Sequence, residues 1–184
     1  VYEISDIMDI LGYEELFQIN HNDIVYPLIM KAIAPNSNLS WQEHNNGQFH
    51  KNLHSIAFVL YFGKNTFLFT GDIENLVIQN IPPAINFLKI PHHGSKSSTS
   101  LLEYLRKVNV SCVTAYKRGK SNNPEIEVID QYNRVSDKVF STYDIEEKNN
   151  DEDFGIVKIT YDILKNTYNR YFYGNGCDIS HIRL

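Results

Sequence analysis

The stretch SIAFVLYFGKNTFLFTGD, residues 55–72, carries the strongest local structural signal in the sequence. Two runs rich in aromatic and β-branched residues flank residues 63–65, and this combination predicts two antiparallel strands joined by a short turn. The second run ends at Gly71 and Asp72, where a glycine removes side-chain bulk beside an acidic residue. The hairpin is therefore expected to end in a turn that presents a carboxylate.

Downstream of this hairpin, residues 84–141 alternate between strand-like and helix-like segments. INFLKI, VSCVTAY and KVFST predict strands, whereas STSLLEYLRKV and PEIEVIDQYNRV predict the helices between them. This order is typical of an α/β layered fold in which helices cover a sheet. The segments IVKITYD and NTYNRYFYG predict a closing hairpin.

Upstream, apolar residues recur at helical spacing over residues 3–18 and predict an N-terminal helix. IVYPLIMKAIAP, residues 24–35, is apolar and contains Pro27, which favours an extended segment over a helix. We therefore expect a helical segment over residues 1–30, followed by the main layered unit over residues 31–184. The loop histidines His44, His50 and His54 are expected to be solvated or to flank the hairpin.

Composition excludes several classes of protein. The 184 residues are 42% hydrophobic, enough for a sizeable core, and the longest apolar runs are too short to cross a bilayer. The net charge of −5 gives no global attraction to nucleic acid, although a local patch can still bind it. Cys112 lies in an apolar run and is expected to be a buried thiol, with Cys177 nearer the end of the sequence. The absence of a disulfide framework favours a reducing, cytoplasmic location.

Chemistry is suggested by two successive turns at predicted strand ends. Asp72 follows one strand, and His92 and His93 follow the next, with Gly94 beside them. Taken alone, the aspartate is explained by helix capping in a turn and the histidine pair is weak evidence for a metal. Together they favour a site for zinc or a similar divalent ion, because carboxylate and imidazole are ligands for such metals.

The segments NLHSIAFVLYFGKNTFLFTGDIE, INFLKIPHHGSKSSTSLLEYL and VSCVTAY together resemble the metallo-β-lactamase fold, and most closely the branch containing the DNA-uptake channel protein ComEC. That branch shows Asn-x-x-Ser before an apolar hairpin, a Thr-Gly-Asp turn, and Leu-Lys-x-x-His-His-Gly-Ser. The matching positions are Asn52, Ser55, Thr70, Gly71, Asp72, Leu88, Lys89, His92, His93, Gly94 and Ser95. The resemblance implies an αββα sandwich, of which this chain is the C-terminal half.

The resemblance also implies roles for the site residues. Asp72 takes the place of a carboxylate that bridges two metal ions, two zinc ions with manganese as the alternative. His92 takes the place of a late histidine ligand, and His93 that of a residue that supports the metal ligands or donates a proton. Gly94 and Ser95 would face an anionic substrate through their backbone amides and the serine hydroxyl, and Lys96 suits such a substrate by its charge.

The family's principal metal motif, His-x-His-x-Asp-His, is absent from this sequence, and Asn123 precedes Pro124 where relatives often have histidine. A half fold would leave an apolar sheet face bare, which soluble monomers rarely tolerate. We therefore expect the missing half to come from a separate chain, from a second copy in an oligomer, or from a segment outside this sequence.

Three functions follow as hypotheses. The first is a metal-dependent hydrolase, similar to phosphodiesterases and nucleases, with nucleic acid as a candidate substrate and the remaining ligands outside this sequence. The second is a catalytically incomplete subunit that acts as a binding or assembly module. The third is hydrolysis of a thioester, lactone or β-lactam by the same metal chemistry.

Overall fold

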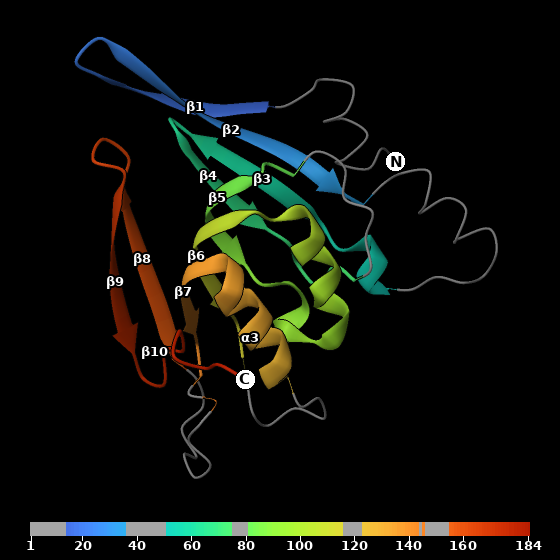
Figure 1. Cartoon of the computed structure of the whole chain (residues 1–184). Coiled ribbons are helices and arrows are strands. Elements are labelled where there is room, and N and C mark those ends of the chain that lie inside the picture. Colours follow the sequence, from blue (N-terminus) through green and yellow to red (C-terminus); the bar gives the residue numbers. More distant parts are fainter. Residues whose placement is uncertain (1–13, 36–50, 75–80, 116–122, 144, 146–154) are drawn as a thin grey trace, which may run out of the picture.

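The computed structural model describes residues 14–35, 51–74, 81–115, 123–143, 145 and 155–184 (Figure 1). The protein is a mixed α/β structure made mostly of strands, with an eight-stranded sheet and a separate two-stranded sheet. Among the described residues, no helix is both long enough and apolar enough to span a membrane.

The large sheet has the strand order β1-β2-β3-β4-β5-β6-β7-β10. Its strands are β1 (Glu14–His21), β2 (Ile24–Ala34), β3 (Ala57–Phe62), β4 (Asn65–Phe69), β5 (Ala84–Lys89), β6 (Lys107–Val113), β7 (Ser136–Ser141) and β10 (Cys177–Asp178). Strands β1 to β4 pair antiparallel in sequence order, and β4 to β7 pair parallel. The parallel half brings the C-terminal ends of β4, β5, β6 and β7 to one edge of the sheet.

Helical segments cover one face of this sheet (Figure 1). They are the α-helix α3 (Ile126–Val135) and the 3-10 helix η3 (Lys96–Tyr104), with the short 3-10 segments η1 (Lys51–His54) and η2 (Pro91–Gly94) at strand ends. The main core lies between sheet and helices. Its fully buried side chains include Leu68, Leu88, Val108, Ile129, Tyr132 and Val139.

A two-stranded sheet of β8 (Ile156–Asp162) and β9 (Thr167–Tyr173) packs against the other face. There, buried Val110, Cys112 and Phe140 contact apolar side chains of the hairpin, and the Phe140 and Phe172 rings meet edge to face at 5.3 Å. The prediction of a buried Cys112 is confirmed.

Most of the expected elements are confirmed. The hairpin of residues 55–72 is β3 and β4, the closing hairpin is β8 and β9, and the alternating segments are β5, η3, β6, α3 and β7. The segment after the histidines forms a 3-10 helix over most of its length.

The N-terminal helix prediction is wrong for residues 14–18, because these residues belong to β1. Residues 1–13 lie outside the described part of the chain. The expected division at residue 30 falls inside β2, which pairs with both β1 and β3. Backbone pairing across the β1-β2 hairpin therefore overrides the local helical spacing, and residues 14–34 are part of the same sheet.

Removing the Tyr132 hydroxyl should destabilise the packing of α3 against η3, the segment that follows the histidine turn. The buried hydroxyl donates a hydrogen bond to the carbonyl of Ser98 in η3 at 2.8 Å. We expect Tyr132→Phe to lower the free energy of unfolding by about 1–2 kcal/mol, because a buried carbonyl loses its partner.

The measurement is urea denaturation followed by circular dichroism. Tyr104→Phe is the matched control, because Tyr104 is 38% exposed at the end of η3 and its change should stay within about 0.5 kcal/mol. Equal unfolding midpoints for the two variants would contradict a structural role for the Tyr132 hydrogen bond.

Candidate functional site

The candidate site lies where three parallel strands end side by side. The turn Thr70-Gly71-Asp72 follows β4, the His92-His93 turn follows β5, and Thr114 follows β6. Parallel strands place their C-terminal ends at one edge, where α/β proteins commonly bind ligands. The two turns that the sequence singled out are therefore brought together.

Hydrogen bonds tie the first two turns to each other. The Thr70 hydroxyl donates to the carbonyl of Lys89 at 2.7 Å, and the amide of His92 donates to the carbonyl of Gly71 at 3.2 Å. The Lys89 ammonium donates to the same Gly71 carbonyl at 2.8 Å. Hydrogen bonds from residues at the end of β5 therefore hold the turn that carries Asp72, in addition to the pairing of its own strand.

The histidine turn has an unusual backbone. His92, His93 and Gly94 are consecutive residues with positive φ values of 40°, 53° and 74°. Non-glycine residues in this region cost on the order of 1–3 kcal/mol each and are concentrated at functional sites. The turn directs the two imidazole rings to different neighbours, with ring centroids 6.3 Å apart.

His93 faces Asp72. Its Nδ1 lies 2.7 Å from the carbonyl oxygen of Thr114, and since a carbonyl only accepts, Nδ1 carries the proton. In the neutral ring, Nε2 then holds a lone pair, and it lies 3.7 Å from Oδ1 of Asp72. A backbone carbonyl that fixes the far nitrogen is the usual support for a histidine that binds a metal.

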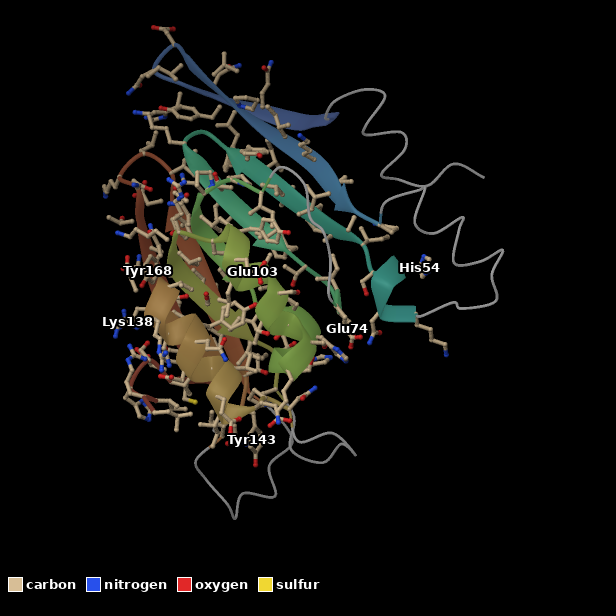
Figure 2. All side chains as sticks on the ribbon, turned by 45° about the vertical axis from the view of Figure 1, so that its right-hand side comes forward. His54, Glu74, Glu103, Lys138, Tyr143 and Tyr168 are labelled. Atoms are coloured by element: carbon tan, nitrogen blue, oxygen red, sulfur yellow. The ribbon has the colours of Figure 1, made fainter. Side chains whose placement is uncertain are left out.

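His92 faces Glu74 instead. Its Nδ1 contacts both Oε1 of Glu74 and, at 3.1 Å, the hydroxyl of Ser95. Asn52 of η1 donates to the same Glu74 oxygen at 2.9 Å. In Figure 2, Glu74 lies at the same end of the molecule as His54 of η1, away from Lys138 and Tyr168.

Lys89 adds a cation to the site. Its Nζ lies 3.6 Å from Oδ1 of Asp72, and its side chain is only 20% exposed. Burial lowers the pKa of Lys89, and the charge of Asp72 opposes that shift. Burial also raises the pKa of the Cys112 thiol to about 12, and the nearby Lys89 ammonium acts in the opposite direction.

The donors at Asp72 and His93 fit a shared divalent ion. Ligands about 2.1 Å from a tetrahedral ion are about 3.4 Å apart, close to the 3.7 Å between His93 Nε2 and Asp72 Oδ1. Two donors do not complete such a site. Within the part of the chain that the structure describes, no group of three or more histidine, cysteine, aspartate or glutamate side chains is arranged to hold a metal ion.

The expected substrate-binding residues differ in exposure. Lys96 is exposed, Ser95 is half-buried with its hydroxyl bonded to that of Ser97 at 2.7 Å, and Gly94 is buried. The amide of Ser95, which we expected to face an anion, donates to the carbonyl of His92 at 3.0 Å. That amide is therefore occupied within the turn.

Three residues of the site had no role in the sequence interpretation. Lys89 appeared only as part of a matching pattern, and Glu74 and Thr114 were not singled out. The signal for Lys89 was a charged residue inside an apolar strand, and the signal for Glu74 was its place two residues after Asp72. Of the loop histidines, His54 ends η1, and His44 and His50 lie outside the described residues.

Comparisons with protein-family models, with curated proteins and with solved structures found no match for this chain.

A side chain at Gly94 should disturb the histidine turn. Gly94 has φ +74°, and an added Cβ would lie 2.9 Å from Cβ of Pro124 and 3.4 Å from Cγ2 of Val113. We expect Gly94→Ala to cost about 1–3 kcal/mol for the backbone conformation alone, with a further loss from the contact with Pro124.

Gly63→Ala is the control for the cost of placing alanine in a backbone conformation with positive φ. Gly63 has φ +59°, but an added Cβ would meet only the ring of Tyr26, which is able to move aside. Urea denaturation should therefore give a larger loss for Gly94→Ala than for Gly63→Ala. A smaller or equal loss would show that the turn does not need a glycine against Pro124.

Proposed function

We propose that this chain carries part of the active site of a divalent-metal hydrolase that cleaves phosphodiesters, with a layered fold like that of the metallo-β-lactamase superfamily. One observation carries the proposal. Nε2 of His93 lies 3.7 Å from Oδ1 of Asp72 while Nδ1 of His93 is held by the Thr114 carbonyl. This is a pair of ligands with its supporting hydrogen bond already in place.

In this proposal Asp72 and His93 are the metal ligands, and His92 takes the role of proton donor or acceptor. The assignment of the two histidines is thus exchanged relative to the one that the resemblance implied. The reason is geometric, because the ring of His93 faces Asp72 and the ring of His92 faces Glu74.

A zinc or manganese ion, when bound, supplies Lewis-acid activation of water and of the scissile bond. Glu74 accepts a hydrogen bond from Nδ1 of His92, so that Nε2 of the neutral ring holds a lone pair that is able to take up a proton and then return it. A carboxylate that orients an imidazole in this way is a recurring device in general acid–base catalysis.

An anionic substrate is favoured by the groups beside the histidine turn. Lys96 is exposed, and the hydroxyl of Ser95 contacts His92 and is bonded to the hydroxyl of Ser97. Cations and hydroxyls are the usual partners of phosphate oxygens. They suit a phosphodiester, including nucleic acid, in which the group that is cleaved is itself anionic, better than the neutral carbonyl group of a thioester, lactone or β-lactam.

We further propose that the remaining ligands come from another half of the fold, in a separate chain, a second copy or another segment. On the sheet face away from the helices, half-buried Phe58, Phe69 and Phe87 lie next to the part that β8 and β9 cover, and Phe87 packs with that part. The rings of Phe58 and Phe69 stack at 5.1 Å, and those of Phe69 and Phe87 lie 5.6 Å apart. A partly exposed aromatic face beside the site suits a packing partner.

A second candidate function is a non-catalytic binding or assembly subunit. It is favoured by the lack of a three-ligand group among the described residues. It explains less well why two strained histidines face carboxylates at the sheet edge.

The test is a titration of the purified chain with zinc or manganese, in which the bound ion is measured in the presence of free ion because two donors alone hold it weakly. We expect Asp72→Ala and His93→Ala to lose the bound metal and His92→Ala to retain it. Asp137→Ala, at a surface position whose carboxylate is 60% exposed, is the matched control and should behave as the parent chain.

Loss of metal in His92→Ala but not in His93→Ala would restore the assignment implied by the resemblance. No bound metal in the parent chain, even with excess metal present, would favour the assembly subunit. If metal binds, the role of His92 in proton transfer is tested with a chromogenic phosphodiester. The parent chain should hydrolyse it, and His92→Ala should lose this activity.

A further inference from the structure

Lys89 is the cation nearest to the proposed metal ligand Asp72 in the described part of the site. It ends β5 two residues after Phe87, so both side chains lie on the sheet face away from the helices. Its own side chain is only 20% exposed. A lysine amine in such surroundings is costly unless a partner compensates its charge.

The same carboxylate oxygen of Asp72 lies close to both Lys89 and His93. Oδ1 of Asp72 lies 3.6 Å from Nζ of Lys89 and 3.7 Å from Nε2 of His93. A divalent ion bound between Asp72 and His93 would therefore use the oxygen that faces the ammonium. The ion and the ammonium are both positive and would both lie next to Oδ1 of Asp72, so they would repel each other.

The structural contribution of the Lys89 side chain is duplicated. The Gly71 carbonyl, its hydrogen-bond acceptor, also accepts from the amide of His92 at 3.2 Å. The bond from the Thr70 hydroxyl uses the backbone carbonyl of Lys89, which any substitution retains. The contribution of Lys89 that the other described contacts of the turn do not duplicate is its positive charge beside Asp72.

We infer that Lys89 is a competing cation, whose ammonium compensates the charge of Asp72 and weakens the binding of a divalent ion at Asp72 and His93. This inference rests on the proposed function, because it takes Asp72 as a metal ligand. With the Lys89 ammonium in place, Asp72 and His93 alone bind a divalent ion weakly. Further donors are then needed for the ion to occupy the site.

The experiment is a titration of the chain with manganese at pH 7 and fixed ionic strength, followed by electron paramagnetic resonance of the free ion. Lys89→Met removes the charge and the hydrogen bond. Lys89→Gln removes the charge and keeps a hydrogen-bond donor on the side chain. Lys89→Arg keeps both and is the matched control.

We expect Lys89→Met and Lys89→Gln to bind manganese at least about tenfold more tightly than the parent chain, and Lys89→Arg to stay within about threefold of it. Circular dichroism identifies any variant that fails to fold, and the two uncharged variants provide independent readings. Unchanged or weaker binding in the folded uncharged variants would overturn the inference.

The proposed function and this inference fail differently. If the parent chain binds manganese through Asp72 and the uncharged variants bind no more tightly, only the role of Lys89 is wrong. If neither the parent nor any Lys89 variant binds manganese, the metal-site proposal fails and the role of Lys89 fails with it.

Discussion

The carbonyl oxygen of Gly71 is the point on which the candidate site depends. It accepts hydrogen bonds from the amide of His92 and from the ammonium of Lys89, and so joins the turn after β4 to the turn after β5. The parallel pairing of β4 and β5 makes this contact available, because it brings both turns to the same edge. Together with the bond from the Thr70 hydroxyl to the Lys89 carbonyl, it holds Asp72 and His93 on adjoining turns.

The parallel half of the sheet could be predicted because its signals are local. Each strand is a short apolar run, and a helical pattern or a turn residue separates it from the next. The N-terminal part could not be predicted in this way. Residues 14–18 have helical spacing, yet they pair with β2, and such pairing depends on partners that a local pattern does not reveal.

The site could be predicted as a meeting of Asp72 with two histidines, but not in its detail. Adjacent histidines give no sequence signal for a left-handed backbone, and only Gly94 hints at one. The directions of the two rings follow from that backbone and from Glu74 and Thr114, which lie on other segments. Residue type therefore indicates the chemistry of such a site, while the division of roles between neighbouring side chains depends on the fold.

The most direct test of the account is nuclear magnetic resonance of the histidine ring nitrogens before and after zinc is added. Before addition, the Nδ1 atoms of His92 and His93 should both carry the proton, because each faces an acceptor. Zinc should then shift Nε2 of His93 to a metal-bound position while Nδ1 stays protonated. A shift at Nε2 of His92 alone, or no shift at either ring, would contradict the assignment of Asp72 and His93 as metal ligands.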